Sequence, residues 1–154
     1  MSLLVPYDDS ALSQTALMRA RQFGAAIDEE VIALVVVPDN VQYVRDRGWL
    51  DEDEPFDRDR VHRGLRVTIE KIAPEATVRF ERPGDSDERA SVTDDVVRTI
   101  RRVAADIDPT TVFIGSENAG DAAPPVSSVG SPLSEDHGYD IYIVHEVQES
   151  ATVA

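Results

Sequence analysis

The sequence contains no cysteine in its 154 residues, which excludes disulfides, thiol nucleophiles and Cys-ligated metals. It also lacks any apolar run near the roughly 20 residues that a membrane-spanning helix needs. Its opening, MSLLVPYDDS, shows neither the basic region nor the long apolar region of a secretory signal. We therefore predict a cytoplasmic protein with no membrane partner. We expect one domain over residues 1–147 and a frayed polar tail, residues 148–154.

Lysine is almost absent as well, because Lys71 is the only lysine among the 15 basic residues. Against these stand 30 acidic residues, and the formal net charge is −15. Nucleic acid is a poor partner for such a surface. An acid excess with almost no lysine predicts adaptation to high internal salt, which screens the self-repulsion of the chain; an ordinary acidic protein is the alternative.

Patterns typical of metal sites and catalytic nucleophiles are missing too. His62, His137 and His145 are scattered, and no pair of them has metal-ligand spacing. The acidic run 51–54 lacks the spaced ligands and the glycine of an EF-hand loop, and no G-x-S-x-G pattern occurs. We therefore predict that the protein is not an enzyme, with slow ATP hydrolysis left open.

What the sequence does contain is a regular alternation of strand and helix patterns. Apolar or alternating runs predict strands at residues 3–7, 31–37, 77–81, 112–115 and 139–147. Helical spacing of apolar residues predicts helices at about 10–27, 57–73, 92–107 and 127–136, with residues 41–60 irregular. Ser10 or Asp9 is expected to cap the first helix, and Thr93 or Asp94 to open the third. This order predicts the α/β class: a parallel sheet with helices on both faces, a three-layer α/β/α sandwich.

The stretch 110–131, TTVFIGSENAGDAAPPVSSVGS, is the main candidate for a binding loop. An apolar strand ends on Gly115, and small residues follow it. Open α/β folds bind phosphates where a buried strand breaks into such a loop ahead of a helix. Asp8 follows the first predicted strand, so its carboxylate is expected at the same edge of the sheet. The alternative is that Asp8 only opens the first helix.

Three stretches resemble the universal stress protein family. Residues 5–10, VPYDDS, are similar to the family's opening V-P-x-D-G-S, with Asp9 in place of the glycine. Residues 35–38 are similar to its second strand, and Gly115-Ser116 to the Gly-Ser that follows its fourth strand. The resemblance covers nearly the whole chain. It implies the adenine nucleotide alpha hydrolase-like fold, a five-stranded parallel sheet of order 3-2-1-4-5.

The same resemblance implies where a nucleotide and a partner would bind. The first-strand aspartate, here Asp8, would contact the nucleotide, and the backbone of the second strand, here at Val37, would meet adenine. The last strand, residues 139–147, would form a homodimer. Independently of the resemblance, an exposed apolar edge strand of this kind favours pairing with a second copy. The alternative is that the tail covers this edge.

The loop departs from the G-x2-G-x9-G-[ST] pattern of the ATP-binding branch. Gly115 fills the first position, but Asn118 replaces the second glycine, and Ser128 stands where the third is expected. Gly130-Ser131 comes two residues late, and Asp121 adds negative charge where phosphate would approach. The candidate nucleotide-binding residues are therefore Asp8, Val37, Gly115, Ser116, Asn118, Gly120, Ser128, Gly130 and Ser131.

These observations leave two functions open. One is a non-catalytic regulatory or stress-response module that acts as a dimer and has degenerate or lost ATP binding. The other is an ATP-binding or adenine-nucleotide-binding stress protein that uses Asp8 and the loop Gly115–Ser131, with ATP and magnesium as possible ligands. A phospho-accepting receiver domain is excluded, since the third strand ends at Arg82-Pro83 and the only lysine, Lys71, lies in a predicted helix.

Overall fold

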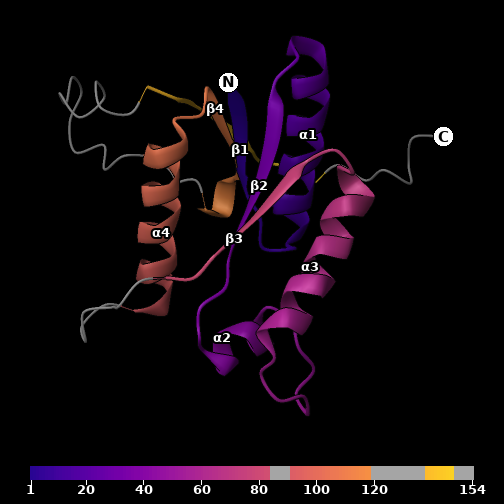
Figure 1. The fold of residues 1–154 in the computed structure, drawn as a ribbon, viewed down its shortest axis with the longest axis vertical. Coiled ribbons are helices and arrows are strands. Elements are labelled where there is room, and N and C mark those ends of the chain that lie inside the picture. The colour runs from indigo at the N-terminus through magenta and orange to yellow at the C-terminus, as the bar shows by residue number, and fades with distance from the viewer. Residues whose placement is uncertain (84–90, 119–137, 148–154) are drawn as a thin grey trace.

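The computed structural model describes residues 1–83, 91–118 and 138–147, and its described strands form one parallel sheet (Figure 1). The five strands lie in the order β3-β2-β1-β4-β5 and pair in parallel throughout. Their bounds are β1 (Ser2–Pro6), β2 (Glu30–Val36), β3 (Thr77–Glu81), β4 (Thr111–Gly115) and β5 (Asp140–Val144). This confirms the predicted sheet order 3-2-1-4-5.

Helices cover both faces of the sheet, which confirms the three-layer architecture. The longer helices are α1 (Ala11–Ile27), α3 (Arg58–Ile72) and α4 (Val92–Ile107), and the short ones are α2 (Val41–Asp46) and the 3-10 turn η1 (Ser116–Asn118). In Figure 1, α4 lies on one side of the strands, and α1 and α3 lie on the other. Two apolar clusters match this division, one packed under α1 and α3 and one under α4.

The central strand β2 shows why the chain adopts this arrangement. Successive side chains of a strand point to opposite faces. Ala33 and Val35 accordingly belong to the cluster under α1 and α3, while Leu34 and Val36 belong to the cluster under α4. A strand buried on both faces needs the continuous apolar run that the sequence shows here.

Side-chain caps fix where the longer helices begin. The Ser10 hydroxyl accepts a hydrogen bond from the Ser13 N–H at 3.2 Å, so Ser10 is the cap of α1, one of the two residues predicted. The cap of α4 is Ser91, upstream of the predicted Thr93 or Asp94. Asp94 instead completes a capping box, because its carboxylate accepts from the Ser91 N–H while its own N–H donates to the Ser91 hydroxyl.

The prediction that residues 41–60 are irregular is wrong for the first part of that range. Helix α2 occupies Val41–Asp46, and the Asn40 side chain caps it by accepting from the Tyr43 N–H at 2.9 Å. Isolated helices this short are not stable in water, so tertiary contacts must hold α2 in place. The buried side chains of Val44 and Leu50 supply such contacts by joining the cluster under α3.

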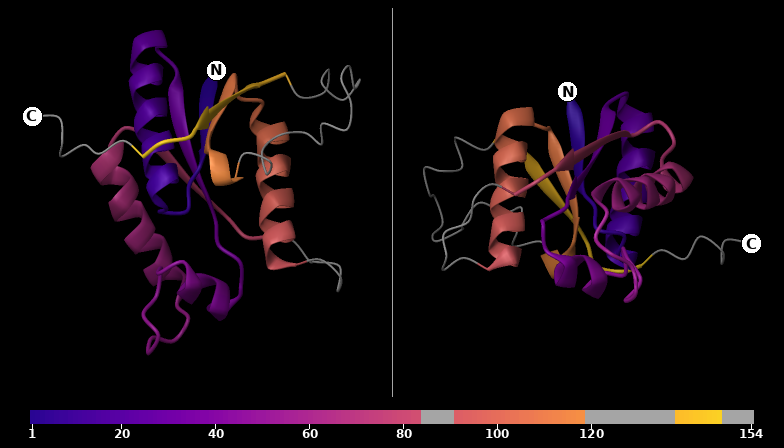
Figure 2. Two further views of the ribbon diagram at one scale, coloured as in Figure 1. Left: turned by 180° about the vertical axis from the view of Figure 1, so that it is seen from behind. Right: turned by 60° about the horizontal axis from the view of Figure 1, so that its bottom comes forward.

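Strand β5 closes the sheet beside β4 but is shorter than the predicted strand 139–147. It pairs with β4 over Asp140–Val144, and the left view of Figure 2 shows it in yellow next to β4. The Tyr142 ring stacks on Phe113, with the ring centroids 4.8 Å apart. The predicted helix at 127–136 and the predicted tail, residues 148–154, lie outside the described residues.

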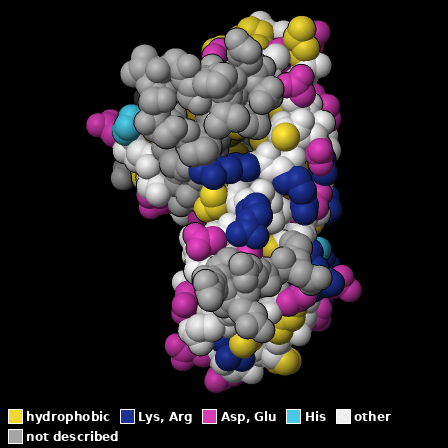
Figure 3. All heavy atoms as spheres, turned by 90° about the vertical axis from the view of Figure 1, so that its left-hand side faces the viewer, with side chains coloured by type: hydrophobic (Ala, Val, Ile, Leu, Met, Phe, Trp, Pro, Cys, Tyr) yellow, Lys and Arg dark blue, Asp and Glu magenta, His cyan; other side chains and the backbone are white. Residues whose placement is uncertain are grey.

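Charge is unevenly distributed over the described surface. On the side of α4, Figure 3 shows most lysine and arginine side chains near the middle and acidic side chains around the margin. Two exposed arginines of α4, Arg98 and Arg102, form ion pairs with Asp95 and Glu81 at 3.9 and 3.6 Å. No helix within residues 1–83, 91–118 and 138–147 is both long and apolar enough to span a membrane.

Candidate functional site

A hollow lies at the carboxyl ends of β1, β2 and β4. Its cavity volume is about 60 Å³, within about 600 Å³ of free space that includes open solvent. Asp8, Val36 and Gly115 contribute to its lining from the three strand ends. Strand order reverses between β1 and β4, since the chain moves outward to β2 and β3 on one side and to β5 on the other. Such a switch point is where open α/β sheets bind ligands.

Asp8 lines this hollow directly after β1, as predicted. Its carboxylate oxygen Oδ1 accepts a hydrogen bond from the Ser10 N–H at 3.0 Å, which is turn chemistry at the start of α1. Its main-chain carbonyl accepts from the indole N–H of Trp49 at 3.0 Å. Asp8 therefore shapes the start of α1 and also belongs to the lining of the hollow.

Asp9, the residue that replaces the glycine of the V-P-x-D-G-S pattern, has a left-handed backbone with φ of 64°. Glycine adopts this conformation without strain, and aspartate is one of the few other residues that adopt it, because its side chain can form local hydrogen bonds. Here the side chain is anchored, because its Oδ1 accepts from the Tyr7 hydroxyl at 2.8 Å and from Gln14 Nε2 at 3.0 Å. The Tyr7 hydroxyl also bonds to Thr68 Oγ1 at 2.9 Å, which ties the end of β1 to α3.

Burial raises the pKa of the Tyr7 hydroxyl far above its ordinary value, and the hydrogen bond to the Asp9 carboxylate raises it further. Tyr7 is therefore protonated at physiological pH and acts as a donor to Asp9. The substitution in the family pattern is thus compensated by a hydrogen-bond network of this chain's own.

Gly115 also lines the hollow, and its lack of a side chain is required by packing. A Cβ at this position would lie 2.7 Å from the Cβ of Leu12 in α1. The close approach of α1 to the end of β4 explains the glycine without any ligand. It also places the backbone of Gly115 in the wall of the hollow.

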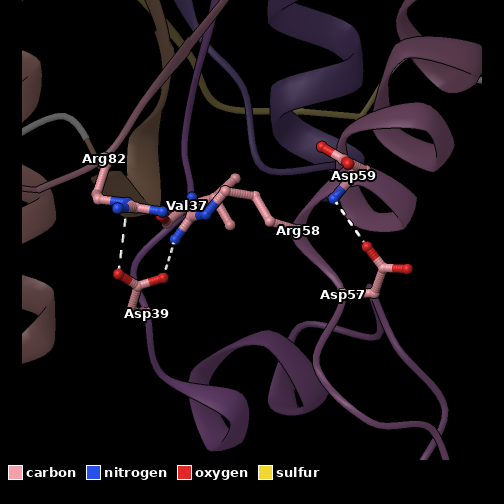
Figure 4. Close-up of polar contacts among 6 residues, drawn as sticks. All are labelled: Val37, Asp39, Asp57, Arg58, Asp59 and Arg82. Atoms are coloured by element: carbon pink, nitrogen blue, oxygen red, sulfur yellow. Dashed lines mark hydrogen bonds and ion pairs between the residues drawn. The ribbon is translucent and has the colours of Figure 1, made fainter.

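Val37 does not reach the hollow. Its N–H donates to the Glu81 carbonyl at 2.9 Å, and its carbonyl accepts from Arg58 Nη1 at 2.7 Å. Figure 4 shows Arg58 and Arg82 meeting at the carboxylate of Asp39 beside this carbonyl. Both polar groups of the Val37 backbone are therefore occupied, and its side chain is fully buried.

Val36, the last residue of β2, belongs to the lining of the hollow. Backbone groups of successive residues in a parallel strand face opposite neighbours. Since Val37 faces β3, the N–H and C=O of Val36 face the side of β1, as the Leu34 carbonyl does when it accepts from the Tyr7 N–H at 2.8 Å. Strand β1 has already ended there, so Val36 lines the hollow.

The outer wall of the hollow comes from the segment that the sequence left unassigned. Tyr43, Arg47 and Trp49 all line it. The Tyr43 and Trp49 rings meet edge to face at 6.0 Å, and the Arg47 guanidinium lies over the Tyr43 ring, 3.8 Å from its centroid. The signal in the sequence was Asn40 as a helix cap ahead of a stretch with two aromatic residues.

The match to a family model decides the classification, because the model of the universal stress protein family covers residues 1–131. The chain belongs to the universal stress protein family. Solved structures agree on the fold: a universal stress protein in complex with cAMP has a TM-score of 0.51 at 18% identity, covering 94% of this chain and 97% of that one. No curated protein gives a significant match.

Two further universal stress proteins show the same fold. One is from Burkholderia pseudomallei, with a TM-score of 0.52, 17% identity, and coverage of 94% of this chain and 95% of that one. The other is UspA from Lactobacillus plantarum, with a TM-score of 0.50, 19% identity, and coverage of 94% and 97%. At these identities the likeness concerns the fold alone.

The universal stress protein loop is described only at its start. Ser116 and Asn118 form η1 directly after β4, and Ser116 is half-buried. Four predicted site residues lie outside the described residues: Gly120, Ser128, Gly130 and Ser131. Of the predicted site residues, the structure therefore brings Asp8 and Gly115 together in one hollow.

No histidine is among the described residues that line this hollow. Within the described parts of the chain, no three His, Asp or Glu side chains gather in a metal-binding arrangement. His62 lies in α3 and stacks on Phe80 at 4.0 Å. Burial lowers the pKa of His62, and the nearby Arg58 guanidinium lowers it further. His62 is therefore a neutral packing residue at pH 7.

Proposed function

We propose that this universal stress protein is a regulatory binding module whose hollow takes the adenosine part of an adenine nucleotide. The observation that supports this is the convergence of Asp8, Val36 and Gly115 at the switch point of the sheet. A universal stress protein of the same fold was crystallised in complex with cAMP, which is consistent with an adenine ligand at such a site.

The chemistry of the hollow suits a nucleoside. Leu34, Val36 and Ile100 give it apolar walls for a planar base. The backbone N–H and C=O of Val36 face it and match the donor and acceptor on one edge of adenine. The Asp8 carboxylate is an acceptor suited to ribose hydroxyls, and its charge strengthens those hydrogen bonds.

The loop that would bind the phosphates is less suited to them than the loop of the ATP-binding branch, because it lacks the second glycine and a correctly spaced Gly-Ser. A polyphosphate needs many backbone donors or a metal, whereas a single phosphate needs few. We therefore propose degenerate ATP binding, in which ATP with magnesium binds no more tightly than AMP. The module responds to a ligand and does not turn it over.

The experiment is equilibrium dialysis of AMP and of ATP with magnesium at high salt. We expect saturable binding of AMP, and we expect Asp8→Asn to weaken it roughly 10-fold or more, since a hydrogen bond to a charged group contributes about 1.5–3 kcal/mol. Asparagine keeps an acceptor for the Ser10 N–H, so the turn survives. Asp106→Asn, an exposed position on α4, is the control.

Absence of saturable binding by either nucleotide at millimolar concentration would overturn the proposal. It would leave a stress protein that acts through partners alone. Phosphate release from ATP above a no-protein control would instead overturn the non-catalytic part.

We also propose that the protein acts as a dimer through β5. This strand is the outer edge of the described sheet on the β4 side. Tyr142 and Ile143 are each 39% exposed, which is high for apolar residues of a sheet strand. An exposed apolar edge strand is suited to pairing with a second copy.

A further inference from the structure

We infer that Arg47 binds the phosphate of the ligand in this hollow, so that the site selects a nucleotide over a nucleoside. This inference rests on the proposed adenine site. The positive charge that would bind the phosphate then comes from the segment after α2, because the loop after β4 carries none. No lysine or arginine occurs between Pro109 and the end of the sequence.

A continuous set of contacts holds Arg47 at the hollow. The indole of Trp49 donates to the Asp8 carbonyl at 3.0 Å, and the Trp49 ring meets the Tyr43 ring at 6.0 Å. Tyr43 in turn supports the Arg47 guanidinium at 3.8 Å. The position of Arg47 is thereby linked, through two aromatic side chains, to the same Asp8 that borders the strand ends.

Arg47 is the sole basic side chain among the described residues that line the hollow, and Asp8 is the sole acidic one. A ligand that carries both ribose hydroxyls and a phosphate is matched to this pair. Hydroxyls are donors for the Asp8 carboxylate, whereas a phosphate is repelled by it and attracted by the guanidinium. The two charges therefore set the direction in which a nucleotide lies.

The arginine is also available for an anion. Other arginines of this acidic chain pair with carboxylates; Arg58 pairs with Asp39, and Arg60 with Glu54. Across residues 1–83, 91–118 and 138–147, no carboxylate lies within ion-pair distance of Arg47. Stacking on Tyr43 uses the face of the guanidinium and leaves its edge, which carries the N–H donors, for another group.

Arg47 also sits at the C-cap of α2, where a cation stabilises the helix dipole. A purely structural role of this kind predicts a change in stability that affects every ligand equally. A phosphate-binding role predicts a change in the ratio of nucleotide to nucleoside affinity. The experiment therefore compares ligands as well as variants.

Trp49 provides the readout, because it is the only tryptophan of the chain and lines the hollow. We would titrate the full-length protein with AMP and with adenosine, following Trp49 fluorescence, at the lowest salt concentration that keeps the protein folded. Equilibrium dialysis of both ligands would run in parallel. The variants are Arg47→Gln and Arg47→Lys, and the control is Arg98→Gln, an exposed arginine of α4.

For the wild type and the control we expect AMP to bind about 10-fold or more tightly than adenosine, as charge-assisted hydrogen bonds to phosphate allow. Arg47→Gln should weaken AMP binding until AMP and adenosine bind with nearly equal affinity, and it should leave adenosine affinity unchanged. Arg47→Lys should keep part of it, since the charge remains and the planar fork is lost. The wild-type ratio should fall as salt rises.

An AMP-to-adenosine ratio that is the same in the wild type and in Arg47→Gln would overturn the inference and leave the adenine site intact. If Arg47→Gln does not fold, an unchanged ratio in Arg47→Lys together with a salt-independent wild-type ratio would overturn it. Absence of binding by both ligands, in fluorescence and in dialysis, would overturn the proposed function itself.

Discussion

At the scale of single residues, Asp9 shows how the chain keeps a turn after losing the glycine that suits it. Its φ of 64° is unfavourable for a residue with a Cβ. The hydrogen bonds from Tyr7 and Gln14 offset that cost. A substitution at this position therefore changes two opposing contributions to the free energy of unfolding, the backbone strain and the side-chain hydrogen bonds. Comparing alanine with glycine at this position separates the two.

We expect Asp9→Ala to destabilise the protein more than Asp9→Gly does. Both variants lose the hydrogen bonds, but alanine keeps the backbone strain, which amounts to about 1–2 kcal/mol. Urea unfolding at fixed high salt would measure the free energy of unfolding of each variant. Equal values for the two variants would show that the left-handed backbone at this position carries no strain.

His62 gives the stability a predictable dependence on pH. Its pKa in the folded protein is lowered from 6.5, first by burial and then by Arg58; Asp59 opposes this shift, and Arg66 and Arg82 add to it. The unfolded chain therefore binds more protons than the folded one just below pH 6.5. The stability that neutral His62 provides is present above that pH and is lost as the pH falls.

We expect His62→Phe to reduce the loss of unfolding free energy between pH 6.5 and 5, since phenylalanine keeps the stacking on Phe80 and does not titrate. Denaturant unfolding at several pH values would measure this slope. The exposed His145→Gln variant is the control. A slope in His62→Phe as steep as in the wild type would contradict the account.

At the scale of elements, α1 packs closely against the end of β4 where Leu12 meets Gly115. We expect Gly115→Ala to cost about 1–3 kcal/mol of unfolding free energy, because the new methyl group overpacks this contact. The cost should shrink in a Leu12→Ala background, which removes most of the opposing side chain.

Gly64 provides the matched comparison for that substitution. It lies within α3, and a Cβ there meets no atom within 4 Å. We expect Gly64→Ala to stabilise the protein by about 0.5–1 kcal/mol through helix propensity alone. Denaturant unfolding checks both variants. A stabilising Gly115→Ala would show that the end of β4 can move away from α1.

The elements also show what the sequence could predict and what it could not. Strands such as β2 were predictable because a short continuous apolar run is typical of a strand that is buried on both faces of a parallel sheet. Helix α2 was missed because its six residues carry no periodic stripe and depend on tertiary contacts. With α2 missed, the aromatic wall and Arg47 were missed as well.

The site was predictable only where a strand end fixes a residue. Gly115 ends β4, and Asp8 comes two residues after the end of β1, so the sheet order alone brings them together. Val36 lines the hollow whereas Val37 faces β3, because backbone direction alternates along a strand, and the apolar run alone does not reveal where the alternation starts.

At the scale of the whole molecule, the formal net charge of −15 predicts a stability that depends on salt. We expect the salt-adapted protein predicted from composition to unfold when salt is removed, because repulsion among its carboxylates is then unscreened. Circular dichroism during dialysis to low salt measures this. A folded spectrum retained at low salt would identify an ordinary acidic protein instead.

The proposed dimer predicts that Ile143→Asp shifts the molecular mass in light scattering from two chains to one, since a charge at the β5 edge opposes pairing. Val67→Asp, at a 50% exposed position on α3, is the control and should leave the mass unchanged. A wild-type mass of one chain at high salt, or an unaltered dimer in Ile143→Asp, would remove β5 from the interface.

The central claim is that the hollow at the carboxyl ends of β1, β2 and β4 holds an adenine nucleotide. A crystal structure of the protein grown with saturating AMP tests it most directly. The account predicts the base beside Val36, the ribose at Asp8 and the phosphate at Arg47. An empty hollow in such crystals, or a nucleotide bound elsewhere on the molecule, would contradict it.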